Sequence, residues 1–487
     1  MDYNKGGVST GRVGREIFSM QTANGSNRIV YGWALISALS LVFAGLFALV
    51  IALARTPYVE NLFPRGAEYL YIALVGHVVL AVVIWFLAFE GFLLAYASTI
   101  ESGRRFWSIP LGWLSLAFSG IGMLLIAFCV LTGRGYAELA NYVPMLIEPV
   151  FYAGLVLFFS GIFIHFVNSG ITIFLEFKEK KTLPATTVGI ATAGIAVITA
   201  LLSFGLSFYL QYSTGKAFID FERLFWGGGH ILQFANTIAM ITAWFFISRF
   251  TVGKLPFKVT PFYKGGSGGI NEKAAKWMFL AYLLFVVPSL GIYAVYDTSS
   301  QEYTNIYTQL MRWGIGPLSG VFIIGVVIFF LREKGLPWRT PGFSSLGLSL
   351  AVFLLGGLVA LDIKGVNTKI PAHYHLAIGA VTIAFMGLFY EMLPFIGRRL
   401  WSLRLARLQP YLYSAGVVLF AAGLYVAGYF GVQRKVYAGE QHLKSMGEYI
   451  GMGIMGFGGL IAILGGLFFV INALASLLKR GEDEAYR

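Results

Sequence analysis

The sequence contains little charge and almost no cysteine, and both shortages narrow the classes of protein it can encode. Only 12% of the 487 residues are Asp, Glu, Lys or Arg, about half of the roughly 25% that is usual in soluble domains. The single cysteine, Cys129, excludes a disulfide framework, a CxxC redox pair and a thiolate zinc site. A charge-poor chain without these features is typical of a membrane protein rather than of a secreted or zinc-binding one.

The first 28 residues lack the pattern of a secretory signal. They are polar and rich in Gly and Ser, with no short apolar segment followed by a cleavage site, so we expect no cleaved signal peptide. The net charge of +13 does not indicate nucleic-acid binding, because the basic residues lie in short loops between apolar runs and form no patch.

What the chain has in abundance is apolar sequence: 57% of its residues are hydrophobic. A transmembrane helix needs about 20 consecutive apolar residues. The sequence therefore predicts an all-α membrane protein with a polar tail at 1–29, a transmembrane domain at 30–478 and a second tail at 479–487. We predict about twelve spans, at 30–53, 69–98, 108–132, 148–175, 186–212, 226–248, 277–297, 314–331, 345–362, 372–397, 410–431 and 449–478.

The distribution of Lys and Arg predicts the orientation of the chain. The N-terminal tail and every second loop after it hold 25 of the 36 basic residues. Because the side richer in Lys and Arg is normally cytoplasmic, both termini are predicted to be cytoplasmic.

Four of the six histidines fall at one predicted depth, near the outer face of the membrane. They are His77, His230, His373 and His375, from the second, sixth and tenth spans. At 1.5 Å per residue, His77 lies ~12 Å from the outer surface. Ionisable residues inside spans are costly and mark functional sites. A secondary transporter, which the hydropathy alone also fits, would place such residues at the midplane.

The two remaining histidines are interpreted differently. His165 lies past mid-membrane, below the other four, and is assigned a structural or water-linked role. His442 lies in an outer loop and is expected to be solvated.

His373 and His375 are two residues apart, so their side chains diverge by roughly 200° on a helix. One helix can thus serve two separate sites. Neutral imidazole is the usual axial ligand of haem iron, and two haems on opposite flanks of the tenth span suit this spacing.

These residues resemble the main subunit of the haem-copper oxidase superfamily, over nearly the whole chain. Residues 366–394, VNTKIPAHYHLAIGAVTIAFMGLFYEMLP, are similar to the family signature of the tenth helix, most of all to the B-type oxygen reductases and the related nitric oxide reductases. The resemblance implies a twelve-helix bundle in which His77 and His375 bind a low-spin haem and His373 binds a high-spin haem. In residues 431–437, GVQRKVY, it implies that Arg434 and Lys435 hold haem propionates, by charge-assisted hydrogen bonds.

The sequence departs from the family at the non-haem metal, which is held by one histidine of the sixth helix and a His-His pair of the seventh. His230, in WGGGHILQF (226–234), fits the first position. The seventh span offers YAVYDTSSQEY (293–303) and no histidine. One alternative is a mixed nitrogen and oxygen site for iron or copper, built from His230 with Asp297, Gln301 or Glu302. Gln233 is a further candidate ligand, and Tyr293 a candidate catalytic residue. The other alternative is that there is no second metal.

The resemblance implies a respiratory oxidoreductase in a bacterial or archaeal cytoplasmic membrane. We expect it to reduce a small diatomic ligand, as a nitric-oxide-reductase-like enzyme or a divergent cytochrome or quinol oxidase. A non-catalytic dihaem electron-transfer or sensing cytochrome is the alternative. Because the chain has no CxxCH motif, we expect a cytochrome c or cupredoxin-like subunit, or a quinol, as the electron donor. The other expected partners are membrane lipid and further subunits, and no nucleic acid.

A reductase near the outer face also needs protons. Within the spans, Glu90 and Glu391 are candidate stepping stones for protons from the cytoplasm. A supply from outside past Glu148, Glu302 or Asp362 is the alternative.

Overall fold

The computed structural model describes residues 25–57, 67–215, 218–256, 269–436 and 442–479. Within these ranges it contains twelve apolar helices that are long enough to cross a membrane, which confirms the predicted number of spans. The predicted tails lie almost wholly outside the described residues. The orientation of the chain across the membrane therefore stays a prediction.

The first half of the chain supplies six spans, of which the second is interrupted twice by a π-helical turn. A π turn inserts one extra residue into the hydrogen-bond ladder and often marks a functional region. The elements are α2 (Ser26–Arg55), α3 (Ala67–Val78) with α4 (Trp85–Ala95) and the π turns at Val79–Ile84 and Tyr96–Glu101, α5 (Ile109–Thr132), α6 (Pro149–Lys180), α7 (Ala185–Ser213) and α8 (Phe221–Val252).

The second half supplies the other six, and here the seventh span is broken. Pro288 lies in the 3₁₀ turn that interrupts this span, as expected of a residue that cannot donate to the helical ladder. The elements are α9 (Gly269–Ala281), α10 (Leu283–Val286), a 3₁₀ turn (Val287–Gly291) and α11 (Ile292–Val295), then α12 (Gln301–Arg332), α13 (Pro341–Leu361), α14 (Lys369–Met392) with a 3₁₀ turn (Leu393–Ile396), α15 (Leu403–Tyr429) and α16 (Met446–Leu478).

The eighth span begins thirteen residues before its predicted start: α12 starts at Gln301 and the apolar run at 314. The predicted start was placed where the continuous apolar run begins. Residues 301–313 do not form such a run, because one side of this part of the helix is polar. Their other side carries Tyr303 and Tyr307, both fully buried. Packing of these two rings, rather than an apolar run, accounts for the first three turns of the helix.

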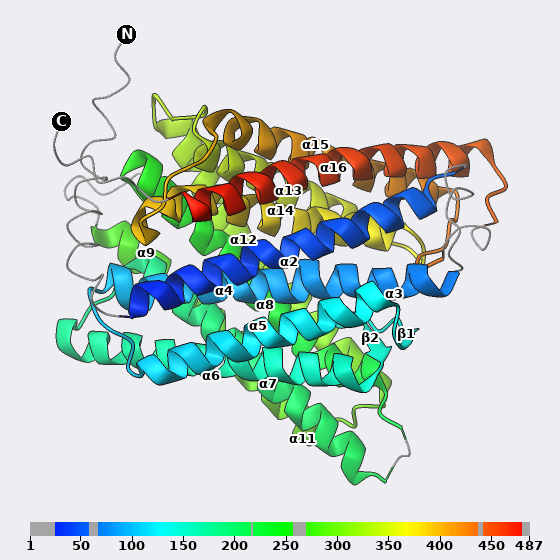
Figure 1. Cartoon of the computed structure of the whole chain (residues 1–487), viewed down its shortest axis with the longest axis horizontal. Coiled ribbons are helices and arrows are strands. Elements are labelled where there is room, and N and C mark those ends of the chain that lie inside the picture. The colour runs from blue at the N-terminus through cyan, green and yellow to red at the C-terminus, as the bar shows by residue number, and fades with distance from the viewer. Residues whose placement is uncertain (1–24, 58–66, 216–217, 257–268, 437–441, 480–487) are drawn as a thin grey trace.

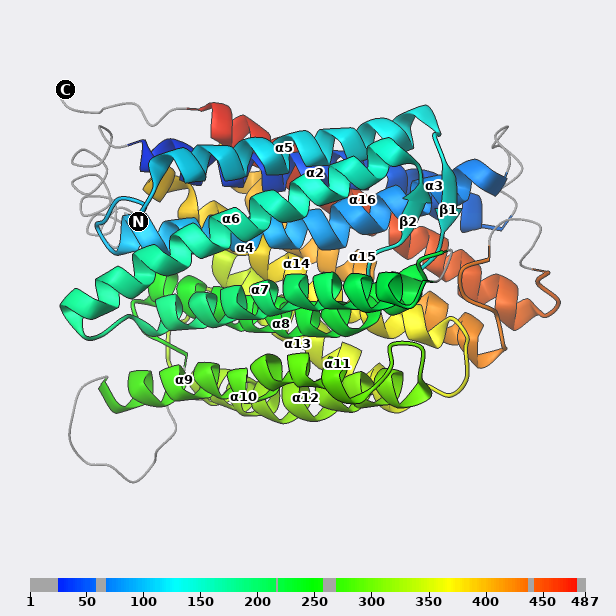
Figure 2. The same cartoon turned by 90° about the horizontal axis from the view of Figure 1, so that it is seen from below.

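The long helices form one bundle, in which the second, sixth and tenth spans lie at the centre. In their most apolar stretches 72%, 89% and 83% of the residues are buried, against 33–44% in most peripheral spans. The first and last spans run side by side (Figure 1), and the Tyr31 hydroxyl donates to the Leu477 carbonyl over 3.2 Å. Figure 2 shows α9, α10 and α12 forming one edge of the bundle beside α7 and α8.

A two-stranded hairpin marks one end of the bundle, which we call the hairpin end. Strands β1 (Tyr136–Glu138) and β2 (Met145–Ile147) pair antiparallel between α5 and α6. In Figure 2 the hairpin lies beside the start of α3, at the end of the bundle opposite the one where α2 begins. The predicted orientation makes the hairpin end the outer face.

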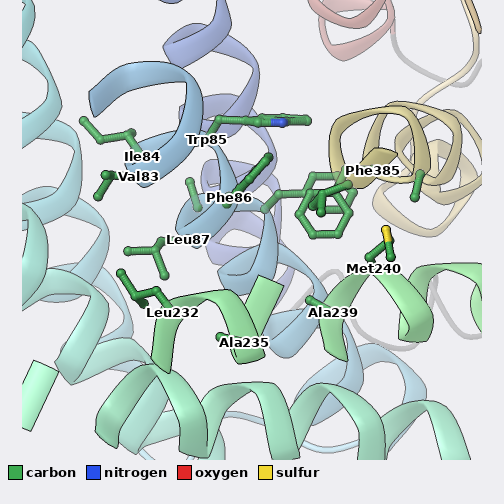
Figure 3. Close-up of a cluster of buried hydrophobic side chains, with 14 of the residues drawn as sticks. Val83, Ile84, Trp85, Phe86, Leu87, Leu232, Ala235, Ala239, Met240 and Phe385 are labelled. Atoms are coloured by element: carbon green, nitrogen blue, oxygen red, sulfur yellow. The ribbon is translucent and has the colours of Figure 1, made fainter. Parts of the chain in front are cut away.

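The three central spans meet in a core of aromatic and aliphatic side chains. Figure 3 shows Trp85 and Phe86 of α4 directed toward Phe385 of α14, with Met240 of α8 close by. The rings of Phe86 and Phe385 meet edge to face, with centroids 5.8 Å apart. Such pairs add to the free energy gained by burial alone, so this core holds the helices that carry the four clustered histidines.

Candidate functional site

His77 and His375 present the same pattern of hydrogen bonds. Nδ1 of His77, on α3, lies 3.0 Å from the carbonyl of Ala44 on α2. Nδ1 of His375, on α14, lies 2.7 Å from the carbonyl of Pro371. Because a carbonyl oxygen only accepts, Nδ1 must carry the hydrogen in each ring, which leaves the lone pair of the neutral ring on Nε2. No group in the described part of the chain hydrogen-bonds either Nε2.

These two imidazoles lie near each other inside the bundle. They interact electrostatically, and each keeps part of its surface accessible although both lie inside the bundle. The His375 ring packs on Phe420 of α15, with centroids 4.7 Å apart. Two neutral imidazoles with uncommitted Nε2 atoms, fixed by carbonyls behind them, are the donor set that a six-coordinate haem requires. The residues present fit a haem.

His373 has the same pattern on the opposite flank of α14. Its Nδ1 lies 2.8 Å from the carbonyl of Gly356 on α13, so its lone pair is also on Nε2. Its side chain is partly accessible. In the described residues no hydrogen bond or ring contact joins another histidine to it, so His373 fits a haem with one protein ligand.

Three cationic side chains gather at the hairpin end near the start of α14. Arg55, at the end of α2, is only 8% exposed, and its charge and that of Arg434 both act on Tyr374. The Lys435 ammonium donates to the Leu139 carbonyl, and burial, with the positive charge of Arg434, lowers the pKa of Lys435. These cations fit the carboxylates of haem propionates.

Arg55 was not among the residues selected from the sequence. Its position in the sequence could have identified it: Arg55 directly follows an apolar run, on the side of the membrane that is predicted to be poor in cations.

His230 differs from the three histidines above, because both of its ring nitrogens have partners. It is 2% exposed. Its Nδ1 lies 2.7 Å from the Trp226 carbonyl, and its Nε2 lies 3.0 Å from the hydroxyl of Tyr142. Tyr142 comes from the hairpin, 88 positions away in sequence. Burial and the charge of Glu222 raise the pKa of Tyr142, so its phenol keeps its proton.

Tyr293, a candidate catalytic residue, belongs to a cluster of three buried tyrosines that packs one helical turn from His230. The hydroxyls of Tyr293 and Tyr303 lie 3.2 Å apart, and Tyr303 also accepts from the backbone N–H of Gly227 over 3.1 Å. The third member, Tyr307, is the one whose ring approaches His230, with centroids 6.1 Å apart. A side chain at Gly227 would meet the Tyr293 hydroxyl at 2.4 Å, so glycine is needed there.

The candidate oxygen ligands of a non-haem metal do not contact His230. Asp297, Gln301 and Glu302 are exposed at the start of α12. The Asp297 carboxylate accepts from the backbone N–H of Ser299 at 2.7 Å, and the Gln301 amide donates to Asn305 at 3.2 Å. Among the described residues no group of three or more His, Cys, Asp and Glu is arranged to hold a metal ion. The residues present therefore do not fit the mixed nitrogen and oxygen site, because the side chains expected to complete it face solvent.

The remaining ionisable residues of the interior are spread through the bundle. His165 donates from Nε2 to the Gly91 carbonyl over 2.9 Å and packs on Trp33, with centroids 4.4 Å apart. Glu90 is fully buried, with no hydrogen-bond partner for its carboxyl oxygens in the described structure. Glu391 accepts from the Gly342 N–H over 3.2 Å. A role for these carboxyl groups in proton supply stays a prediction.

Asp362, a candidate for proton supply from outside, is held in a polar network beside the start of α14. Its carboxylate accepts from Lys369 Nζ and from the Tyr425 hydroxyl, each at 2.7 Å. These hydrogen bonds, with the charge of Lys369, lower the pKa of Asp362. A carboxyl group whose pKa is lowered on folding stabilises the protein above its unfolded pKa of ~3.9, and that contribution is lost as the pH falls through the folded value.

We therefore expect Asp362→Asn to lower the melting temperature slightly at pH 7 and to have a smaller effect at pH 3. The effect is small because the carboxylate is 43% exposed. Thermal unfolding of both proteins from pH 7 to pH 3 measures it. An equal difference at both ends of this range would mean that the charge of Asp362 is not what stabilises the network.

Comparisons with known proteins agree with this geometry. Residues 28–468 match the family model described as cytochrome c and quinol oxidase polypeptide I. An uncharacterized protein of Rickettsia prowazekii is 29% identical, over 91% of this chain and 95% of its own length. An uncharacterized protein of Aquifex aeolicus is 30% identical, over 75% and 84%. Cytochrome c oxidase subunit 1 of Thermus thermophilus is 24% identical, over 87% and 79%.

A solved structure shares the fold. It is a haem-copper terminal oxidase dimer determined by cryo-electron microscopy, which aligns with a TM-score of 0.77 over 95% of this chain and 86% of the other, at 19% identity.

Proposed function

Because the chain belongs to the cytochrome c and quinol oxidase polypeptide I family, we propose that it is the dihaem core subunit of a respiratory membrane oxidoreductase. Membership of the family makes it a multi-pass membrane protein of haem-based electron transport. The assignment of two haems is supported by the hydrogen bonding that three imidazoles have in common. His77, His373 and His375 each donate from Nδ1 to a backbone carbonyl and keep the Nε2 lone pair uncommitted.

We assign the low-spin haem to His77 with His375, and the high-spin haem to His373. When bound, a haem with two imidazoles carries single electrons, and a haem with one leaves a position open to a small ligand. The chain's own part is to fix the ring planes through Ala44, Pro371 and Gly356. The aromatic core around Phe385 (Figure 3) packs together the helices that carry these histidines. The cations Arg55, Arg434 and Lys435 hold the propionates.

The reaction we favour is reduction of a small diatomic ligand at the His373 haem, similar to that of nitric oxide reductases and B-type oxygen reductases. The electron donor we expect is a cytochrome c or cupredoxin-like subunit or a quinol, so we expect further subunits. The second candidate is a dihaem cytochrome that transfers electrons or senses a ligand without turnover. The hydrogen bond between His230 and Tyr142 favours it, because the imidazole that would hold a second metal is already occupied.

The absorption spectrum of the purified protein tests the proposal. We expect two haems per chain in the reduced spectrum, with carbon monoxide altering one of them. Consumption of nitric oxide or oxygen by the reduced protein separates the enzyme from the second candidate. His442→Ala is the matched control for alanine variants of the haem-binding histidines. His442 is exposed near the hairpin end, so this variant is expected to keep both haems. A protein without a Soret band would exclude both candidates.

A further inference from the structure

The hydrogen bonds of His230 show which of its nitrogens could bind a metal. The Trp226 carbonyl is an acceptor only, so the hydrogen of the neutral ring is on Nδ1 and the lone pair is on Nε2. That lone pair accepts the hydrogen bond of the Tyr142 hydroxyl at 3.0 Å. A metal ion at His230 would need the same electrons. Tyr142 and a metal are therefore alternatives at this position.

Three features of the structure fix the position of Tyr142: the hydrogen bonds of its neighbour Asn141, its backbone conformation and the contact of its ring with Gly229. The Glu222 carboxylate accepts from the backbone N–H and from the side-chain amide of the preceding residue, Asn141, each at 2.6 Å. The backbone of Tyr142 has φ of 67°, a left-handed conformation that non-glycine residues seldom adopt and that is concentrated at functional sites. Its ring lies against Gly229, where a Cβ would approach the Tyr142 ring to 2.2 Å.

The rings that contact His230 offer no substitute ligand. His230 makes ring contacts with Tyr142, Trp226 and Tyr307, none of which is a good ligand for copper or iron in its neutral form. One imidazole alone holds such metals weakly. The helix that carries His230 also packs against α13 and α14, which carry Gly356 and His373.

We propose that Tyr142 takes the place of the family's non-haem metal at His230. The ligand pocket beside the His373 haem then holds a hydrogen-bonded phenol–imidazole pair and no second metal. The place of the pair beside the His373 haem rests on the proposed function. The exclusion of metal from His230 does not depend on it. The pair makes Tyr142 a residue of the ligand pocket, positioned by Asn141, Glu222 and Gly229.

Metal binding tests the exclusion independently of the haems. The purified protein is loaded with copper(I) or with iron(II), dialysed and analysed for total metal, and haem iron is counted separately as pyridine haemochrome. We expect total iron to equal haem iron and copper to stay at background. One non-haem metal atom per chain that is lost in His230→Ala would overturn the proposal. The haem count, which tests the proposed function, is read from the same sample without affecting this result.

The stretching frequency of carbon monoxide bound to the reduced haem tests the place of the pair in the pocket. We expect a shift in Tyr142→Phe, and the same shift in Gly229→Ala, which displaces the ring but keeps the phenol. The matched controls are Tyr136→Phe, at a 75% exposed tyrosine of the same hairpin, and Gly205→Ala, where a Cβ meets nothing within 4 Å. An unchanged frequency in both test variants would overturn the assignment of Tyr142 to the pocket.

Discussion

Replacing His375 with alanine is expected to remove one of the two haems, and replacing His373 is expected to remove the other. The two residues lie on one helix, but their rings diverge by roughly 200° and donate to different carbonyls, Pro371 and Gly356. His375→Ala leaves His77 without the second imidazole of its pair. His373→Ala removes, from the other flank, an imidazole whose Nε2 has no hydrogen-bond partner in the described part of the chain. Each variant should therefore bind about half of the haem of the wild type.

Haem content per chain, together with the electron paramagnetic resonance spectrum of the oxidised protein, measures this result. We expect His375→Ala to lose the low-spin signal and keep the high-spin one, with carbon monoxide still bound, and His373→Ala to show the reverse. Tyr374→Phe is the matched control, because Tyr374 lies between the two histidines and is 40% exposed. Loss of the same haem in both variants would contradict the assignment of two sites to opposite flanks of α14.

A second large effect is expected where α15 packs against α16. Gly423 lies where the two backbones approach closely: a Cβ there would come within 2.2 Å of the Met455 nitrogen and 2.5 Å of the Gly451 carbonyl oxygen. Small residues at such crossings let membrane helices pack closely. The sequence signal is a seven-residue spacing of glycines, at 416 and 423 on one helix and at 451, 458 and 465 on the other.

Gly423→Val is therefore expected to force the helices apart. No change of rotamer relieves a contact with backbone atoms, and overpacking typically costs about 1–3 kcal/mol or more out of a total stability of roughly 5–15 kcal/mol. Because α15 also supplies Phe420 to the ring of His375, we expect most of the haem-loaded, monodisperse protein to be lost.

Size-exclusion chromatography monitored at the Soret wavelength, with thermal unfolding, measures the effect. Gly453→Val is the matched control: it makes the same change on α16, at a position where a Cβ meets nothing within 4 Å. If the two variants behaved alike, the loss would come from valine in a helix and not from the contact between the helices.

Hydropathy predicted the span count correctly, because the apolar character of a run is a local property of the chain. Twelve apolar runs follow directly from the residue types, and two histidines at i and i+2 diverge on any helix. Hydropathy failed at the start of α12, where buried Tyr303 and Tyr307 extend a helix into polar sequence.

The oxygen ligands predicted for His230 do not contact it in the structure, for a related reason. Asp297, Gln301 and Glu302 follow the seventh span closely in sequence, and proximity along the chain was the only available guide. In the structure Asp297 turns back on Ser299 and caps the loop before α12, which directs these polar groups to solvent.

The sequence by itself determined the membrane class of this protein, its twelve spans and its family, and it supplied the histidines that we propose as haem ligands. Those properties depend on residue type and on spacing within single helices. The tertiary structure alone decided what each imidazole meets: a carbonyl behind Nδ1 in four cases, and at His230 a phenol from a hairpin 88 positions away. Contacts between elements so distant in sequence depend on how the helices pack, and no local pattern encodes them.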